Sequence, residues 1–582
     1  MTSMDATKLT FKPAFERDAD GKFGPNSLLV FALGLYAQAE DLQALAAEAL
    51  TDGSGDKNCD ACLIDVEEER AIIVQASCSK AWGGPEAKAS KADDLNTAMT
   101  WLLEMRIEDV PDRIKSKAKD LREAIAEGKI SRIDILYVHN CQESANVRKA
   151  LEAVVLGTRK MVDPDGAKGI TVSSRELGLS AIEELFKASD KVVVVEDVLD
   201  VPGVKLGEIK GPQWKAIVVT ADGKWFRDLY TTYHDDLFSA NYRGYLGTTR
   251  RRRNINAQIR ETVATQPQNF WAFNNGVTIL TTKIEEIGNY VKIHGCSIIN
   301  GAQTSGSLGE ATEGDAGKAQ VLCRIVECSD RSLVDQIVRF NNTQNAFRSA
   351  DMRSNDPIQK RLAGEFKSFG IEYVHRRVGT FTPKDAISAE GIAPALAAFH
   401  GKPQMAGRNR SQIFESEIEY RSLFDLTISA QHVYLVYSLA VALDKLKLSL
   451  KAKVSAGTAT DLDLQQYNVL EHSMSKHFVL YIIGRLAEEL LGTRIPDLKK
   501  WASKDALVKP DMVRAVDSWG SVLEAIMPLL AVQVKELGDP YDVTRSEDLT
   551  KKAGDKMKAI VTAFKKQTEE QLKRIREATR LS

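Results

Sequence analysis

Hydrophobic residues recur along the chain with two different periods. Up to about residue 200, short apolar runs such as 61–66, 71–77 and 130–140 alternate with longer segments whose apolar residues recur at helical spacing. Residues 26–48 have helical spacing throughout, which predicts one helix ahead of the first strand pair. Strand and helix patterns that alternate in this way are typical of an α/β domain.

Beyond this first part the pattern changes twice. Strand-like segments interrupted by Asn, Gly and Arg are predicted at 214–225, 270–282, 290–300 and 319–328, and two helices follow, near 331–341 and 356–369. After residue 425 almost every segment has helical spacing. We therefore predict three domains, which are an α/β domain over residues 1–200, an α+β domain over residues 201–425 and an all-α domain over residues 426–582.

Composition narrows the class of protein. The 582 residues are 43% hydrophobic and 27% charged, as in ordinary globular proteins. There are 78 Lys and Arg against 80 Asp and Glu, which gives a net charge of −2. This balance excludes binding of nucleic acid through overall positive charge, so any nucleic-acid site must be a local basic patch. Seven scattered cysteines, an N-terminus without a signal-peptide core and an apolar stretch of 11 residues at 433–443 predict a cytoplasmic protein with no membrane partner.

Two polar residues flank the first predicted strand pair. Asp60 opens the first strand and Gln75 lies near the end of the second, so their oxygens are candidate ligands for Mg²⁺ or Mn²⁺. A lysine two residues after Gln75 would share its face of the strand and could stabilise charge on a phosphate. Ser77 occupies that position, and the nearest lysine is Lys80. The candidate catalytic residues are therefore Asp60, Gln75 and Lys80, with Asp60 and Gln75 as metal ligands.

This order of elements resembles the PD-(D/E)xK nucleases, which have the restriction-endonuclease-like fold. The resemblance implies metal-dependent cleavage of nucleic acid by the N-terminal domain. Ser77 leaves an alternative open, in which the domain is a degenerate scaffold and Asp60 lies in a solvated turn. The pair Cys59 and Cys62 has no second pair nearby to complete a zinc site, so we interpret both as ordinary thiols.

Side-chain amides and arginines concentrate in the central part of the chain. The candidate binding residues there are Asn274, Asn275, Asn300, Gln303, Arg324, Asn342, Gln344 and Arg348. They form either a self-satisfied polar core or a pocket in which amides contact base edges and arginines bind phosphate. A run of four arginines, Arg250, Arg251, Arg252 and Arg253, lies between aromatic-rich stretches, which suits nucleic acid but also a solvated loop or a docking patch.

Several motifs in this region occur in one characteristic order. They include Asn274-Asn275-Gly276, Asn300-Gly301-Ala302-Gln303-Thr304, Asn342-Thr343-Gln344-Asn345 and Asp356 to Gln359. Over roughly 230–425 the chain resembles the AIPR family, the abortive-infection phage-resistance proteins of bacteria. The resemblance implies an anti-phage protein that acts on nucleic acid or senses it. A metal-dependent nuclease is the first hypothesis, and a non-catalytic sensor or scaffold that signals to a partner effector is the alternative. Either is compatible with a protein partner or a homo-oligomer.

Overall fold

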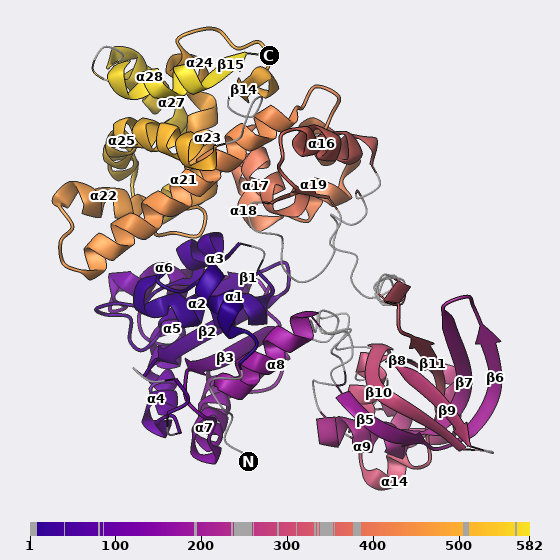
Figure 1. Ribbon diagram of the computed structural model, residues 1–582. Coiled ribbons are helices and arrows are strands. Elements are labelled where there is room, and N and C mark those ends of the chain that lie inside the picture. Colours follow the sequence, from indigo (N-terminus) through magenta and orange to yellow (C-terminus); the bar gives the residue numbers. More distant parts are fainter. Residues whose placement is uncertain are drawn as a thin grey trace. The chain divides into compact units, whose positions relative to one another are not determined.

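The computed structural model describes residues 9–39, 41–79, 82–84, 86–190, 195–233, 237, 259, 261–287, 290–309, 311–330, 333–334, 337, 341, 353, 356–375, 386–504, 511–564, 567 and 569–581. Two compact units are present, one built from residues 12–179 together with 348–582, and the other from residues 180–347 with a short N-terminal segment. Figure 1 shows an N-terminal sheet, a central sheet and a largely helical C-terminal region, so the predicted sequence of fold classes is confirmed at this level.

The N-terminal sheet has the strand order β1-β2-β3-β4. Strands β1 and β2 form an antiparallel hairpin, and β3 and β4 add in parallel, each after helical segments. The elements in chain order are α1 (Lys12–Asp18), α2 (Ser27–Ala37), α3 (Leu42–Ala49), β1 (Ala61–Asp65), β2 (Arg70–Ser77), α4 (Ala89–Asp93), α5 (Leu95–Leu103), α6 (Asp112–Ala126), β3 (Arg132–His139), α7 (Ala145–Val162), β4 (Thr171–Leu177) and α8 (Leu179–Asp190). Consecutive residues of β2 and β3 are buried whichever way they point, as expected for a sheet with both faces covered.

The single helix predicted over residues 26–48 is wrong. Helix α2 ends at Ala37, where Gln38 adopts a left-handed conformation (φ 53°). A new helix, α3, begins after Asp41, whose side chain accepts hydrogen bonds from the backbone N–H groups of Gln43 (2.8 Å) and Ala44 (3.1 Å). Two caps therefore break an apolar pattern that is continuous in sequence.

The central sheet has the order β5-β10-β8-β11-β7-β6, with β9 added beside β10. Its pairings are antiparallel except that of β8 with β11. The elements are β5 (Val195–Val201), β6 (Val204–Lys210), β7 (Trp214–Asp222), α9 (Gly223–Tyr233), α12 (Phe270–Phe273), β8 (Val277–Thr281), β9 (Lys283–Ile287), β10 (Tyr290–Asn300), α13 (Ala302–Gly309), α14 (Glu313–Ala316) and β11 (Gln320–Cys328). The strand predicted over 270–282 is wrong in its first four residues, which form α12.

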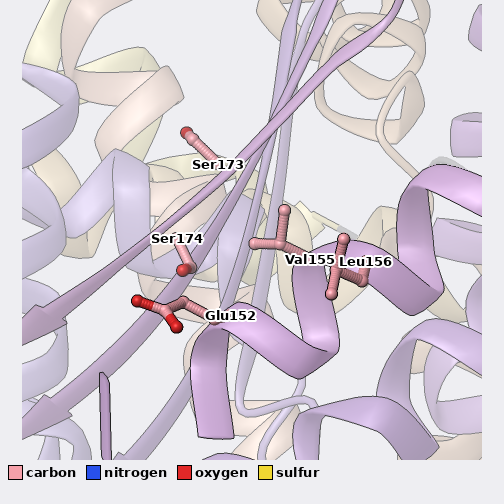
Figure 2. Close-up of a pocket in the computed structure, with 5 residues that line it drawn as sticks. All are labelled: Glu152, Val155, Leu156, Ser173 and Ser174. Carbon is pink, nitrogen blue, oxygen red and sulfur yellow. The ribbon is translucent and has the colours of Figure 1, made fainter. Parts of the chain in front are cut away.

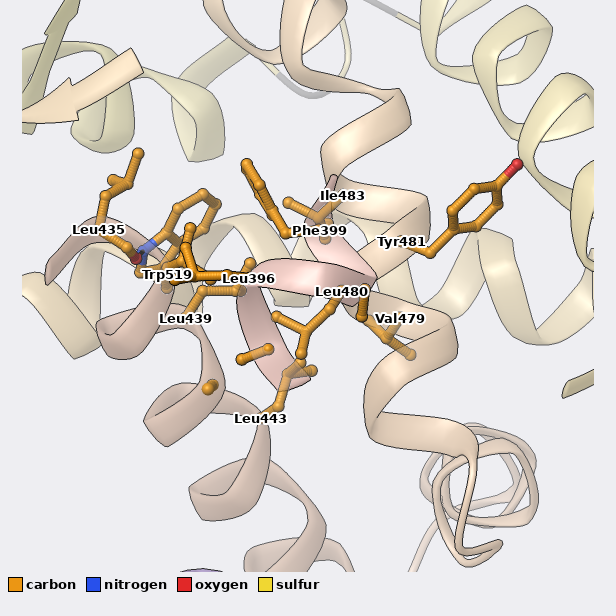
Figure 3. Close-up of a cluster of buried hydrophobic side chains, with 14 of the residues drawn as sticks. Leu396, Phe399, Leu435, Leu439, Leu443, Val479, Leu480, Tyr481, Ile483 and Trp519 are labelled. Carbon is orange, nitrogen blue, oxygen red and sulfur yellow. Dashed lines mark hydrogen bonds between the residues drawn. The ribbon is translucent and has the colours of Figure 1, made fainter. Parts of the chain in front are cut away.

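The C-terminal region shares one hydrophobic core, which runs from Ile358 to Ile575. Figure 3 shows part of it, where Trp519 lies among Leu396, Phe399, Leu435 and Leu439. The main elements are α16 (Pro357–Ser368), α17 (Ala389–Phe399), α18 (Pro403–Arg408), α19 (Gln412–Glu415), α20 (Glu417–Leu423), α21 (Ala430–Ser455), α22 (Asp461–Leu470), α23 (Ser475–Arg485), α24 (Ala487–Leu491), α25 (Met512–Leu537), α26 (Pro540–Arg545), α27 (Glu547–Ala563) and α28 (Glu569–Ala578), with short strand pairs β12 (Tyr373–Val374) with β13 (Ile387–Ser388) and β14 (Trp501–Ser503) with β15 (Thr579–Leu581).

One helix of the described residues, α25, is long and apolar enough to cross a membrane by length and composition. Its most apolar window is 61% buried. Trp519, Val522 and Ile526 of this helix are part of the hydrophobic core, so its apolar character is explained by packing against neighbouring helices.

Candidate metal centre and central amide cluster

The segment before β1 folds back on itself and is called the metal loop here, residues 51–60. Asp60 donates its backbone N–H to the carbonyl of Val74 on β2 (2.8 Å). The carbonyl of Asp60 accepts from the N–H groups of Thr51 (2.8 Å) and Asp52 (3.0 Å). These bonds join the two ends of the loop, and they bring Asp52 beside Asp60.

Three carboxylates meet in this loop. One oxygen from each of Asp52, Asp56 and Asp60 lies within 4.8 Å of the others. Asp56 also accepts from the backbone N–H of Gly53 (2.9 Å), and Asp52 accepts from the side-chain amide of Asn26 (2.8 Å). Loop geometry therefore concentrates negative charge at one place, where it favours a cation.

Asp60 is the buried member of this group, with 7% of its surface exposed. The pKa of Asp60 is raised to about 7, mainly because the carboxyl is buried. The hydrogen bond from Ala76 N–H (2.6 Å) and the charge of Lys91 oppose this rise, whereas the charges of Asp52 and Asp56 add to it. This location contradicts the alternative that Asp60 lies in a solvated turn. A carboxyl in these surroundings gains from a cation that replaces its proton.

Gln75 supplies a second buried group at the same place. Its side-chain amide nitrogen donates to Oδ2 of Asp60 (2.9 Å), so the two predicted ligands are in direct contact. The residue is 6% exposed, and its Oε1 has no hydrogen-bond partner among the described residues. A 180° flip of the Gln75 side-chain amide would exchange its nitrogen and oxygen and place Oε1 beside the Asp60 carboxylate. The two residues would then offer neighbouring oxygen ligands.

The residues present therefore fit a divalent cation that prefers oxygen, such as Mg²⁺ or Mn²⁺. The donors are carboxylates and one amide oxygen. The Oε1 of Gln75 is buried without a hydrogen-bond partner among the described residues, and a cation would satisfy it. Asp52 and Asp56 were missed by sequence reasoning. The signal was present as three aspartates at intervals of four residues in a Gly- and Asp-rich segment.

Ser77 occupies the position where the nuclease pattern has a lysine. Ser77 ends β2, and its side chain hydrogen-bonds the hydroxyl of Tyr137 on β3. Lys80, the predicted replacement, lies outside the described residues. Lys91 of α4 is a cation whose charge acts on Asp60, and it pairs with Asp94 (3.1 Å) at the surface.

Cys59 and Cys62 are buried in the core between the sheet and its helices. Burial raises the pKa of both thiols, that of Cys62 to about 11. Thr51 donates its hydroxyl to the sulfur of Cys59 (3.6 Å). Protonated thiols in an apolar core agree with the interpretation that the pair is structural.

In the central unit, two glycine-containing loops touch. Gly276 and Gly301 both have left-handed backbones, with φ of 79° and 89°. A Cβ on Gly301 would lie 2.7 Å from the carbonyl oxygen of Gly276. The loop with Asn274 and Asn275 and the loop with Asn300 are thus neighbours, and their contact requires glycine.

Two of the predicted central residues contact the same third residue, Asn341. Asn300 donates its amide to the carbonyl of Asn341 (2.8 Å), and Arg324 donates to Oδ1 of Asn341 and to the hydroxyl of Thr278 (3.2 Å). We call Asn300, Arg324 and Asn341 the central amide cluster. Arg324 is exposed and Asn300 is half-buried, so the cluster is open to solvent.

The remaining central candidates are placed in part. Asn274 donates to the carbonyl of Phe270 (3.0 Å) and Asn275 is exposed. Gln303 lies in the first turn of α13, but its side chain lies outside the description. Three more candidates, Asn342, Gln344 and Arg348, lie outside the described residues. The arginine run, Arg250, Arg251, Arg252 and Arg253, lies outside them as well. Sequence reasoning did not mark Phe273, which is 62% exposed beside Trp271, itself 44% exposed.

A separate hollow of about 390 Å³ lies between α7 and β4 (Figure 2). It is lined by Glu152, Val155, Leu156, Ser173 and Ser174. None of the predicted site residues that the structure describes is among these five. The hydroxyl of Ser173 is already bonded to Asp134 (2.6 Å), and the hollow adds nothing to the metal centre.

Comparison with known families gives one match, to the AIPR protein family, over residues 238–573. This match covers more than half of the chain, and the chain belongs to the AIPR (abortive infection phage resistance) family. The match begins after the N-terminal sheet and runs through the C-terminal helices, well beyond the 230–425 of the sequence resemblance. It contains the central amide cluster and leaves the metal loop outside. Comparison with curated proteins and with solved structures gives no significant match.

Proposed function

We propose that this protein is an anti-phage defence protein whose N-terminal sheet cleaves nucleic acid with the help of Mg²⁺ or Mn²⁺. The contact of Asp60 with Gln75, together with Asp52 and Asp56, carries the proposal. It is supported by the hairpin-and-parallel-strand order of the sheet, which is compatible with a restriction-endonuclease-like fold. Family membership supports the defence role.

The residues of this centre have distinct roles in the proposed reaction. Asp60 and Gln75 would hold the cation, and the negative charge of Asp52 and Asp56 would strengthen its binding. A bound cation would supply polarisation of a phosphoryl oxygen and a lower pKa of an attacking water. In the hydrolysis itself, the water oxygen bonds to phosphorus as the bond to the leaving oxygen breaks, and the proton lost by the water ends on the leaving oxygen.

Lys91 replaces the lysine that is absent at Ser77. Its side chain is about half exposed, and within the described part of the chain it pairs with Asp94 (3.1 Å) at the surface. Such a group can turn toward a phosphate that approaches Asp60 and stabilise its charge in the transition state. Lys80 is the second candidate for this role.

The central unit is proposed to hold the nucleic acid. The exposed guanidinium of Arg324 suits a phosphate, and the neighbouring amides suit base edges. Exposed Trp271 and Phe273 offer rings on which bases stack, on a helix that packs against the strand of Arg324. The arginine run 250–253 adds a further phosphate contact in this proposal.

The test is cleavage of single-stranded and double-stranded DNA and RNA by the purified full chain, with Mg²⁺, Mn²⁺ or a chelator. We expect cleavage only with metal, and a loss of about 10²-fold or more in Asp60→Asn and in Lys91→Ala. Asp109→Asn, at an exposed surface pair, should cleave normally. Metal-independent cleavage, or full activity of Asp60→Asn, would contradict the proposal.

One observation favours a second function, that of a non-catalytic sensor that binds nucleotide or nucleic acid and signals to a partner. Ser77 is bonded to Tyr137, so the usual lysine position makes no contribution to phosphate chemistry. In that case wild-type protein would bind nucleic acid without cleaving it. Asp60→Asn would then still protect cells in a phage-plating assay, whereas the nuclease proposal predicts loss of protection.

A further inference from the structure

Helix α21, which belongs to the matched family region, contacts the base of the metal loop. Lys451 on this helix donates its ammonium group to the carbonyl oxygen of Leu50, the residue directly before the loop. Both residues are buried, with 8% and 9% of their surfaces exposed. The metal loop is therefore anchored by a residue that follows it by about 400 positions in the sequence.

A second contact, between α6 and α21, lies beside Gly53 near the start of the loop. Arg113 of α6 donates to the hydroxyl of Ser455 at the end of α21 (3.1 Å). Gly53 lies against both groups, because a Cβ there would be 3.0 Å from the Arg113 guanidinium and 3.1 Å from the Ser455 hydroxyl. Its backbone angle, φ 138°, is also one that other residues rarely adopt. The loop has no room to shift toward α21.

A buried lysine at this place is costly for the fold. Burial lowers the pKa of Lys451 well below its usual range, and the neighbouring charges of Lys447, Arg113 and Lys117 lower it further, whereas Asp52 raises it. An apolar side chain of similar length would fill the same volume without this cost. The lysine contributes what an apolar chain cannot, which is a hydrogen bond to the base of the metal loop.

We propose that Lys451 is a positioning residue of the metal centre, which fixes the metal loop so that Asp52 and Asp60 present their oxygens together. This inference rests on the proposed metal centre. It makes the ligands of the N-terminal sheet dependent on a helix of the family region. A movement of α21 would then change metal affinity, which provides a route for regulation.

The experiment is a calorimetric titration of the full chain with MnCl₂, with thermal unfolding measured on the same samples. Lys451→Met keeps the approximate side-chain length and removes the hydrogen bond to Leu50. We expect its Mn²⁺ dissociation constant to rise about 10-fold, as is usual for residues that orient metal ligands. Lys445→Met is the matched control on the same helix, since Lys445 is exposed and its ion pair among the described residues is with Asp517 (3.4 Å) at the surface.

A second variant covers the case in which Lys451→Met fails to fold. Ser455→Ala removes the partner of Arg113 at an exposed position and should weaken Mn²⁺ binding in the same direction, with little change in melting temperature. If wild-type protein binds Mn²⁺ and both variants bind it with the same affinity, the inference about Lys451 is overturned, whereas the proposed metal centre is not. Absence of Mn²⁺ binding by wild-type protein overturns the metal centre itself.

Discussion

At the scale of single residues, the buried carboxyl of Asp60 is the most informative group. Its pKa of about 7 in the fold compares with about 4 in an unfolded chain. Between these values the folded protein binds more protons than the unfolded chain, so the free energy of unfolding falls as the pH rises from 4 to 7. Burial of the Asp60 carboxyl therefore lowers the free energy of unfolding at neutral pH, and a cation bound to the folded protein there would offset this loss.

This cost predicts the behaviour of Asp60→Asn in metal-free buffer. The variant cannot ionise, and its amide oxygen can still accept from Gln75 and Ala76. Its melting temperature should exceed that of wild-type protein at pH 8 and approach it at pH 4. The free energy of unfolding should be higher by a few kcal/mol at pH 8, because each pKa unit corresponds to about 1.4 kcal/mol. Thermal unfolding across this pH range measures it. Parallel curves of melting temperature against pH for variant and wild type would show that Asp60 is not buried as described. The control Asp109→Asn, at an exposed ion pair, should follow the wild-type curve.

Trp271 carries a second prediction at the same scale. If bases stack on its exposed ring, Trp271→Ala should weaken binding of a labelled single-stranded oligonucleotide by about 10-fold, since one stacked base contributes about 1–3 kcal/mol. Trp271→Phe should retain most of the affinity. Fluorescence anisotropy measures both. Tyr290→Ala removes another exposed ring, 74% exposed in the same unit, and an equal loss in this variant would rule out a specific platform.

At the scale of elements, strands were easier to predict from sequence than breaks and caps. The strands β1, β2, β3, β10 and β11 follow from apolar runs that are buried in the sheets. The break between α2 and α3 was missed because Gln38 in a left-handed conformation has no signal in hydrophobic spacing. Helix α12 was missed because its four residues, Phe270–Phe273, are too few to show a helical spacing. Asn274, Asn275 and Gly276 separate it from β8.

The candidate sites show the same limit. Asp60 and Gln75 could be paired in sequence because neighbouring strands of a hairpin bring their ends together. Asp52 and Asp56 lie near them only because the carbonyl of Asp60 closes the loop, a bond that no pattern reveals. The contact of Lys451 with Leu50 depends on packing between distant segments and was beyond sequence reasoning for the same reason.

The touching loops of the central unit predict a destabilising substitution. Gly301→Ala places a methyl group 2.7 Å from the Gly276 carbonyl and strains a backbone with φ 89°. We expect a loss of about 1–3 kcal/mol in the free energy of unfolding, measured by denaturant unfolding. Gly314→Ala, in the same unit with open space around it, should change stability by less than about 0.5 kcal/mol. Equal stability of the two variants would mean that the loops do not touch.

At the scale of the whole molecule, charged contacts join the N-terminal sheet to the C-terminal helices within one compact unit. Arg545 of α26 donates to Asp120 and Glu123 of α6, and its guanidinium lies over the ring of Tyr541 (4.3 Å). Tyr541 donates its hydroxyl to Glu123 as well (3.0 Å). The sheet that carries the metal loop and the family region are therefore coupled by more than the Lys451 contact.

This coupling predicts a large effect of Arg545→Ala. The substitution leaves Asp120, which is 6% exposed, without its cation, and breaking a buried pair typically costs about 3–5 kcal/mol. Urea unfolding should show the loss. Arg485→Ala removes an exposed pair with Asp555 and should cost less than about 1 kcal/mol. A small effect of Arg545→Ala would show that the two regions are held mainly by apolar contacts.

The central claim is that Asp60 and Gln75 hold a divalent cation, and anomalous X-ray scattering from crystals grown with MnCl₂ tests it most directly. The account predicts one strong manganese peak with oxygens of Asp60 and Gln75 at about 2.0–2.6 Å. The peak should vanish in crystals of Asp60→Asn grown under the same conditions. Crystals of wild-type protein without a manganese peak at Asp60, at a pH above 7 where its carboxyl is ionised, would contradict the account.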